Sequence, residues 1–421
     1  TFTVIGEVPS GIERSHGMID MSCKYTRLNV GLQDAYVRED KLDQLKNVDA
    51  IIFDCDGVLI DISDSYNKAI SKTVALIFGG LTGYSIKENL ISNDVIFFFR
   101  RTGGFNNDWD TVYGILMFML SHLPERLRTQ LKESIGALER QQDPATRFLL
   151  LKAMTEGKID RPRLREEFFR ELISGLKEFT KQLDREGVRS VDRNLARTAN
   201  LGEPPGFYKA LKDFLCHPAG VDESMISRAF EECYCGSKLF LQAYGIEPRL
   251  YNGSGMIEKS RVIIREEVLE QLTSFLGKAN FGVASGSRFE SAKYVLKELL
   301  GRFNSKALIF LDEIERTELE CSTRNGPKVS LRKPNPFSLL RALEGMYPVN
   351  LPVYVGDSME DVMMVREAVK ASPQLLSAGV YGHSYPSDRF LRIFLEFGCD
   401  IVLPSVNELP AVLGGVWRKK S

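Results

Sequence analysis

The sequence predicts an α/β protein in which a doubly wound, Rossmann-like parallel sheet carries a large, mostly α-helical insertion. In the C-terminal part of the chain, short apolar runs rich in β-branched and aromatic residues alternate with segments of helical periodicity. After the first apolar run, a long stretch shows helical periodicity with charges of both signs, as in PERLRTQLKESIGALERQ, and no convincing strand.

The predicted strands are short and bounded by turn residues, which is typical of strands buried on both faces of a sheet. They are AIIFD ending at Asp54, FGVAS ending at Ser285, ALIFLDE ending at Glu313, LPVYVGD ending at Asp357, AGVYG over 378–382 and DIVLPS near residue 400. The helical segments RFESAKYVLKELL and MEDVMMVREAVK follow the second and fourth of these runs. Ligands of such sheets bind outside the carboxyl ends of the strands, so we expect functional residues there.

The chain, at 421 residues, is long enough for two or three domains. We expect a core formed by 48–66 and 262–421 and a helical cap domain over 67–261. Residues 1–47 would be an N-terminal arm, in which TFTVIGEV could form an edge strand packed on the core. NLGEPPGFY, over 200–208, is the predicted internal loop of the cap.

The composition predicts an ordinary soluble, cytoplasmic protein. A formal net charge of −1 disfavours a nucleic-acid or membrane surface, because both favour a strong basic bias. We expect neither a secretory leader nor a membrane span, because no basic stretch leads into an apolar one near Thr1 and no apolar stretch reaches ~18 residues. The seven cysteines lack zinc-site spacing and are interpreted as reduced thiols. The composition leaves the oligomeric state open.

The segment IIFDCDGVLID, residues 51–61, places two carboxylates where a buried strand ends. Asp54 and Asp56 share a face of an extended chain, and two carboxylates held so close repel unless a cation neutralises them. Mg²⁺ suits such a place, because it binds carboxylate oxygens and keeps water and substrate phosphate as further ligands. Gly57 fits a sharp departure of the backbone from the strand. An aspartate pair in an ordinary turn is the alternative.

Three further segments place phosphate- or metal-binding groups at predicted strand ends or loops, in chain order. In VASGSR, Ser285 and Gly286 offer a hydroxyl and backbone N–H groups for phosphate oxygens. In RKPNP, Lys333 offers a fixed ammonium group. In YVGDSMEDV, Asp357 and Asp361 add acidic groups one helical turn apart. A helix cap, a surface lysine and an N-cap are the respective alternatives, but four such coincidences are improbable.

DCDGV, SGS, KPNP and GDSMED resemble, in this order, the four motifs of the haloacid dehalogenase (HAD) superfamily. The resemblance covers the predicted core, and the insertion after the first motif resembles the C1 cap of subfamily I. It implies a Rossmann-like core and hydrolysis of phosphomonoesters through an aspartyl-phosphate.

Carried over by motif, the resemblance implies a role for each core residue. Asp54 would be the nucleophile and Asp56 the general acid/base, which weighs against a dehalogenase because that reaction protonates no leaving oxygen. The phosphoryl group would be held by Ser285, Gly286 and Lys333, and Mg²⁺ by Asp54, Asp56, Asp357 and Asp361.

Substrate choice would come from the cap, where FFFRRTGGFNNDWD (97–110) is unusually polar and aromatic. One hypothesis is a substrate-recognition loop formed by Arg100, Arg101, Asn107, Asp108 and Trp109, which fits a small hydrophilic organic phosphate. The alternative is a turn in which Asn-Asn-Asp caps the next helix and Trp109 packs in the core.

Other functions remain open at this point. A phosphoryl-transfer mutase would use the same residues as the phosphatase. A non-catalytic member binding phosphorylated ligands or a protein, and a receiver-like signalling module, are less favoured. The intact acid pair disfavours the former, and the motif order and the large insertion disfavour the latter.

Overall fold

The computed structural model describes residues 23–30, 33–105, 107–138, 143–158, 164–199, 206–325, 329–383 and 387–415. The chain divides into two compact units, an α/β unit formed by Thr1–Ile62 and Ser260–Ser421 and a helical unit formed by Ser63–Lys259. The cap was expected over 67–261, a few residues from the limits of the helical unit, and residues 1–47 were expected as an arm separate from the core. TFTVIGEV and most of the predicted 200–208 loop lie outside the described residues.

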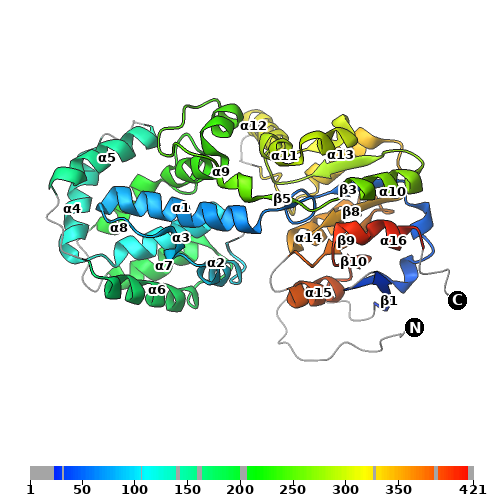
Figure 1. The fold of residues 1–421 in the computed structure, drawn as a ribbon, viewed down its shortest axis with the longest axis horizontal. Coiled ribbons are helices and arrows are strands. Elements are labelled where there is room, and N and C mark those ends of the chain that lie inside the picture. The colour runs from blue at the N-terminus through cyan, green and yellow to red at the C-terminus, as the bar shows by residue number, and fades with distance from the viewer. Residues whose placement is uncertain are drawn as a thin grey trace. The chain divides into compact units, whose positions relative to one another are not determined.

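An eight-stranded sheet forms the centre of the α/β unit, in the order β1-β2-β10-β9-β8-β3-β6-β7 (Figure 1). The strands from β10 to β7 pair in parallel, whereas β2 pairs antiparallel with both β1 and β10. Their bounds are β1 Tyr25–Val30, β2 Gln33–Arg38, β3 Ala50–Phe53, β6 Phe281–Ala284, β7 Leu308–Ile309, β8 Pro352–Gly356, β9 Leu376–Val380 and β10 Ile401–Leu403. A separate short pair joins β4 Ile60–Asp61 to β5 Arg261–Val262.

The order of the parallel strands makes β3 the place where the chain reverses direction across the sheet. From β3 the chain proceeds to β6 and β7 on one side, and it then returns to β8, β9 and β10 on the other. Crevices at such reversal points, outside the carboxyl ends of the strands, are where open α/β sheets bind ligands. The predicted doubly wound α/β fold is therefore confirmed, and Asp54 directly follows the strand at the switch point.

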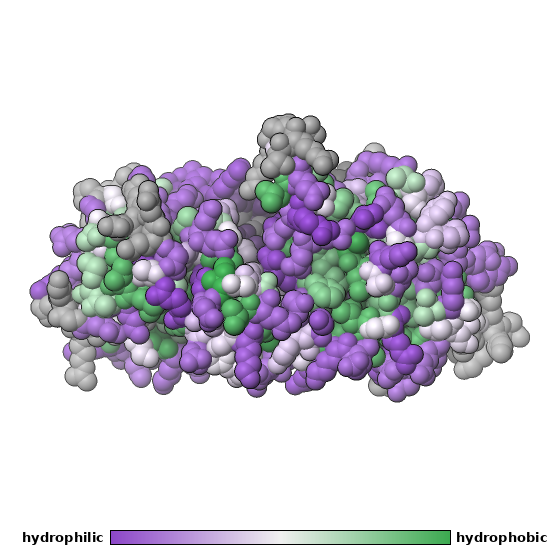
Figure 2. Space-filling view, turned by 90° about the horizontal axis from the view of Figure 1, so that it is seen from above, coloured by the Kyte–Doolittle hydropathy of each residue, from purple (hydrophilic) through white to green (hydrophobic). Residues whose placement is uncertain are grey.

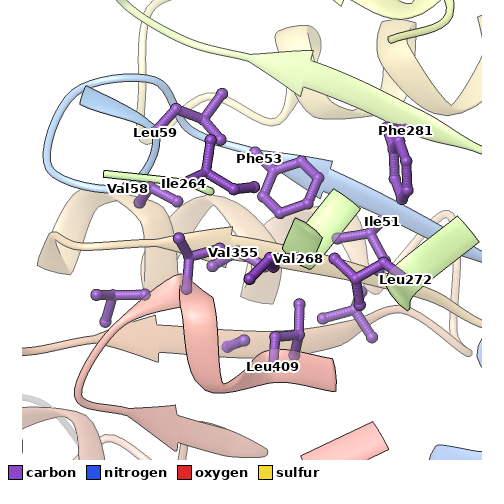
Figure 3. Close-up of a cluster of buried hydrophobic side chains, with 14 of the residues drawn as sticks. Ile51, Phe53, Val58, Leu59, Ile264, Val268, Leu272, Phe281, Val355 and Leu409 are labelled. Carbon is purple, nitrogen blue, oxygen red and sulfur yellow. The ribbon is translucent and has the colours of Figure 1, made fainter. Parts of the chain in front are cut away.

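Helices cover both faces of this sheet because alternate residues of its strands point to opposite sides. Ile51 and Phe53 of β3 pack in one apolar cluster with α10 and α16, as Figure 3 shows. Ala50 and Ile52 pack on the other side with residues of α13 and α14. The helices of the unit are α10 Glu266–Leu276, α11 Phe289–Leu296, α12 Leu311–Asn325, α13 Phe337–Met346, α14 Met359–Ala368, α15 Ser387–Glu396 and α16 Leu409–Leu413.

One predicted strand is wrong in its extent. The run ALIFLDE was expected to continue to Glu313, but β7 ends at Ile309 and α12 begins at Leu311. The Asp312 carboxylate accepts a hydrogen bond from the backbone N–H of Phe289 (2.8 Å) in the first turn of α11. Asp312 therefore has a structural role, because it accepts a hydrogen bond from an N–H group that has no partner within its own helix.

The helical unit is built around α1 and α3, which contact each other. Every residue of α3 from Thr111 to Ser121 is buried, which fits a helix that is apolar on all sides. The helices are α1 Ser63–Thr82, α2 Asn93–Arg100, α3 Asp108–Ser121, α4 Glu125–Gly136, α5 Pro144–Lys158, α6 Glu166–Thr180, α7 Val188–Ala199, α8 Phe207–Leu215 and α9 Met225–Tyr244.

The surface is that of a chain with many charged residues. Hydrophilic residues cover most of the face in Figure 2, with smaller hydrophobic areas between them. Within the described ranges, no helix combines the length and the apolar character needed to cross a bilayer.

Candidate functional site

Asp54 lies where β3 ends, with its backbone fixed by the neighbouring strand. Its N–H donates to the carbonyl of Val355 in β8 (2.8 Å), and its Oδ1 accepts from the N–H of Cys55 (2.8 Å). The residue is only 8% exposed. The sheet therefore holds this carboxylate in a defined direction, with little access for bulk water.

The Lys333 ammonium group lies against two carboxylates that are far away in the sequence. Its Nζ is 2.9 Å from Oδ2 of Asp54 and 2.7 Å from Oδ1 of Asp361. The Lys333 side chain is 10% exposed, so it is not the surface lysine of the alternative interpretation. Burial acts to lower the pKa of Lys333, but the charges of Asp361 and Asp54 outweigh it and raise the pKa, so the group stays charged.

Asp361 is held by donors from its own helix end as well as by Lys333. Ser358 is the N-cap of α14, and Asp361 completes a capping box with it. Oδ2 of Asp361 accepts from the backbone N–H groups of Asp357 (3.2 Å) and Ser358 (3.0 Å) and from the Ser358 hydroxyl (2.7 Å). Burial acts to raise the pKa of Asp361, but Lys333 and these hydrogen bonds outweigh it and lower the pKa.

Asp357 completes a cluster of three carboxylates. One oxygen from each of Asp54, Asp357 and Asp361 lies within 4.8 Å of the other two. Burial, together with the charges of Asp361 and Asp54, raises the pKa of Asp357 well above its ordinary value. Burial also raises the pKa of Asp54, with Lys333 acting in the opposite direction. When all three carboxylates are ionised, the Lys333 ammonium group balances the charge of only one of them.

This donor set fits a hard divalent cation. Carboxylate oxygens are the ligands that Mg²⁺ prefers, and a bound cation would offset both the burial and the neighbouring carboxylate charges that raise the pKa values of Asp54 and Asp357. Both oxygens of Asp361 already accept several hydrogen bonds. Asp54 and Asp357 are therefore the residues best placed to hold a metal ion, with Asp361 as a support.

Gly57 lets the first loop pass close to this cluster. Its φ is +74°, a left-handed conformation that favours glycine. A Cβ at this position would also lie 1.9 Å from Oδ2 of Asp357. A side chain at residue 57 would thus displace Asp357. Glycine is therefore favoured at this strand exit for a steric reason as well as for its backbone conformation.

Ser285, Gly286 and Ser287 follow β6 and connect to the first loop. Ser285 is buried and its hydroxyl lies 3.1 Å from that of Ser287, while Gly286 between them is exposed. The Ser287 hydroxyl donates to Oδ2 of Asp56 (2.7 Å). Ser285 also acts to lower the pKa of Asp54 through hydrogen bonding, although burial outweighs this effect. The structure thus brings the predicted core residues together at one edge of the sheet, whereas Asp56 is linked to Ser287 and lies outside the carboxylate cluster found among the described residues.

Sequence reasoning missed two hydroxyl groups of this site. Ser287 was part of a quoted motif but received no role. Tyr354 was treated as an apolar strand residue, yet its hydroxyl contacts both Lys333 Nζ and Asp361 Oδ1 at 2.8 Å. A signal existed for Tyr354, since it is the polar-tipped residue in the otherwise aliphatic run PVYVG of β8.

The predicted substrate loop belongs to the helical unit, where its polar residues have structural partners. Asn107 is the N-cap of α3 and its side chain accepts from the N–H of Trp109, as the capping alternative expected. Arg100 forms an ion pair with Asp108 (2.8 Å). The Trp109 indole N–H donates to Glu231 (3.0 Å), and the exposed Arg101 lies over the ring of Phe98. Asn106 lies outside the described residues.

Comparisons with known proteins give a fold but no family. No model of a known protein family matches the chain. Myosin-D of Toxoplasma gondii is 26% identical over 155 residues, which cover 34% of this chain and 19% of the myosin. The chain thus spans a small part of that relative's length, and nothing about the myosin's activity transfers to it.

Two solved structures resemble the chain more broadly. The X-ray structure of a Northeast Structural Genomics Consortium target is 18% identical, with a TM-score of 0.63 covering 88% of this chain and 100% of that chain. At that identity the likeness shows a shared fold. A phosphatase, Tt82 from Thermococcus thioreducens, is also 18% identical and covers 87% of this chain and 99% of that chain, but its TM-score of 0.46 is too low to support a conclusion.

Proposed function

We propose that this chain is a Mg²⁺-dependent phosphomonoester hydrolase of the HAD type, acting through an aspartyl-phosphate on Asp54. The observation that carries the proposal is the buried contact of Lys333 with Asp54 and Asp361, next to Asp357. A structural ion pair needs one carboxylate for one ammonium. Excess buried carboxylates at a sheet switch point fit a site that receives a cation and a phosphate.

The reaction would begin with attack of the Asp54 carboxylate on phosphorus. The bond from phosphorus to the ester oxygen breaks, and Asp56 donates its proton to the departing oxygen. Asp56 then removes a proton from the water that attacks the phosphorus of the aspartyl-phosphate, which releases inorganic phosphate and restores Asp54. Ser287 holds the Asp56 carboxylate, and Lys333 offsets negative charge beside the nucleophile.

A bound Mg²⁺ would be held by Asp54 and Asp357, and the chemistry it supplies is neutralisation of charge on the phosphoryl oxygens and the nucleophile. Ser285 and the backbone at Gly286 would hold phosphoryl oxygens at the end of β6. These residues distinguish poorly between alcohols attached to the phosphate. Substrate choice among small organic phosphates therefore belongs to other parts of the chain.

Changing Asp56 to Asn tests the acid role through the leaving group. We expect Asp56→Asn to lower kcat/KM by about 10²–10⁴-fold for alkyl phosphates, because a poor leaving group needs the proton. The loss should be much smaller for p-nitrophenyl phosphate, whose leaving group departs as a stable anion. Steady-state kinetics with a series of esters in Mg²⁺ measures this, and a loss independent of the leaving-group pKa would contradict the role.

The substrate role of the 97–110 loop is a separate proposal, which now rests mainly on Arg101. Its guanidinium is exposed and lies over the ring of Phe98, whereas Arg100 and Asp108 pair with each other. We expect Arg101→Ala to change relative kcat/KM values within a panel of metabolite phosphates while sparing p-nitrophenyl phosphate. Arg170→Ala, at an exposed arginine of the same unit, is the matched control. A uniform effect on all esters would reject a recognition role.

A phosphoryl-transfer mutase remains the second candidate, since it would use the same core residues. The two activities differ in whether water or a second hydroxyl accepts the phosphoryl group from Asp54. Release of inorganic phosphate from a panel of small hydrophilic phosphates, measured alongside isomer formation, separates them and identifies the substrate class. A protein that binds phosphate but releases none from any ester would fit the non-catalytic alternative.

A further inference from the structure

Tyr354 places a hydroxyl group at the junction of three chain segments. Its ring is 1% exposed and packs with Ile52 and Leu339 on one side of the sheet. The residue lies in β8, three positions before Asp357, so its phenol reaches toward the strand ends. A buried tyrosine hydroxyl without partners costs free energy, and this one therefore has to be satisfied by its surroundings.

The partners of this hydroxyl come from segments that are remote in sequence. It lies 2.8 Å from Nζ of Lys333, 2.8 Å from Oδ1 of Asp361 and 3.1 Å from the carbonyl oxygen of Ala284. Lys333 can only donate, so the tyrosine oxygen accepts from it. The tyrosine hydrogen is then directed to Asp361 or Ala284. The hydroxyl thus joins the loop of Lys333, the start of α14 and the end of β6.

The contact with Tyr354 gives the Lys333 ammonium group its third hydrogen-bond acceptor. An ammonium group has three hydrogens, and three acceptors surround Lys333 Nζ: Asp54 at 2.9 Å, Asp361 at 2.7 Å and the Tyr354 hydroxyl. The carboxylates alone would leave the ammonium group, on a flexible four-carbon stem, with two acceptors for its three hydrogens. A third, rigid acceptor on an aromatic ring restricts where Nζ can lie.

We propose that Tyr354 is a positioning residue, whose hydroxyl holds the Lys333 ammonium group at Asp54 in the geometry needed for phosphoryl transfer. The kinetic form of this inference rests on the proposed hydrolase function. Tyr354 itself touches neither Asp54 nor a substrate in this arrangement. Its effect passes through Lys333, and a displacement of about 1 Å at such a group can cost about 10²-fold in rate.

Tyr354→Phe removes the oxygen and keeps the ring that packs in the core. We expect kcat for p-nitrophenyl phosphate to fall by about 10- to 100-fold with little change in KM. Affinity for vanadate, a mimic of the phosphoryl transition state, should fall by a similar factor. Tyr381→Phe is the matched control, because the Tyr381 hydroxyl is also in the α/β unit and donates to the carbonyl of Asp34 (2.9 Å), away from Lys333. Unchanged kcat and vanadate affinity in folded Tyr354→Phe would overturn the proposal.

A measurement on the lysine itself separates this inference from the proposed function. In ¹⁵N-lysine-labelled protein, we expect a slowly exchanging Lys333 ammonium signal that is absent in Lys333→Met, with a nuclear Overhauser effect to the Tyr354 ring. The signal should exchange faster in Tyr354→Phe and stay unchanged in Tyr381→Phe. If the wild-type protein hydrolyses no ester, the proposed function fails while this experiment still tests the contact. A wild-type signal without the Overhauser effect, or one indifferent to Tyr354→Phe, would refute the contact even if that variant folded poorly.

Discussion

Asp54→Asn is expected to abolish phosphatase activity while leaving the fold intact. Asparagine has nearly the same shape as aspartate but is a poor nucleophile, so no aspartyl-phosphate can form. We expect kcat for p-nitrophenyl phosphate in Mg²⁺ to fall by at least about 10³-fold. The wild-type protein should transfer the phosphoryl group to Asp54, which mass spectrometry after acid quenching detects as an acyl-phosphate on the peptide that contains residue 54.

The control for this experiment is an aspartate of the same unit outside the site. Asp40 is exposed and pairs with Arg38 at the surface, so Asp40→Asn should change neither kcat nor the labelled peptide. Normal turnover by Asp54→Asn would exclude this nucleophile. A phosphorylated peptide elsewhere in the chain would relocate the active site, and the convergence of Lys333 on Asp54 would then need a structural explanation.

The sequence was a good guide where the signal is a buried strand that ends in a polar residue. Such a run has few other interpretations, because burial on both faces requires a parallel sheet and the sheet brings the strand ends together. Asp54 and Asp357 were placed correctly at their strand ends for this reason. Strands β1 and β2 were not predicted, since their position at the edge of the sheet gives the partly polar sequences YTRLNV and QDAYVR.

Contacts between side chains of loops far apart in the sequence could not be predicted from the spacing of residues within each motif. Asp361 was expected to help hold a metal ion, and it does belong to the carboxylate cluster, but its further roles as a cap of α14 and a partner of Lys333 were not predicted. Tyr354 looks like any strand tyrosine until the Lys333 loop is placed over its hydroxyl. The link between Ser287 and Asp56 likewise joins two loops that are 231 residues apart. Local periodicity carries no information about which side chain of one loop meets another.

In the 97–110 loop the local sequence signal was sufficient. The capping turn, given as the alternative to a recognition loop, describes the observed role of Asn107. Asparagine directly before an apolar helix is a common N-cap, and Asn107 has that role. Arg100 and Asp108 are eight residues apart and flank a turn, which allows the ion pair between them. Polar residues that satisfy a turn between helices resemble a recognition loop in sequence. The ion pair and the cap therefore reduce the residues available for substrate binding, without deciding the role of Arg101.

We expect the cluster of Asp54, Asp357 and Asp361 to lower the free energy of unfolding when no metal ion is bound. Three carboxylates approach one another around a single ammonium group, and burial raises the pKa of Asp357 well above its ordinary value. Folding without a metal ion therefore costs free energy at neutral pH, because the unfolded chain would leave this carboxyl ionised in water. We expect Asp357→Asn to raise Tm in EDTA, by about 1 °C for each kcal/mol of relieved destabilisation if all 421 residues unfold together. Differential scanning calorimetry measures the change.

The same substitution should reverse its effect when Mg²⁺ is added. A cation that binds only the folded wild-type protein stabilises it by about 2.7 kcal/mol at 100 times its Kd, and Asp357→Asn should lose most of this gain together with catalysis. Asp40→Asn should behave like the wild-type protein in both conditions, since its carboxylate lies at the surface. A lower Tm for Asp357→Asn in EDTA would mean that the carboxylate is compensated by neighbours in the folded state. Equal stabilisation of both proteins by Mg²⁺ would mean that the cation binds away from Asp357. The positive charge that the attack of Asp54 requires would then have to come from another group.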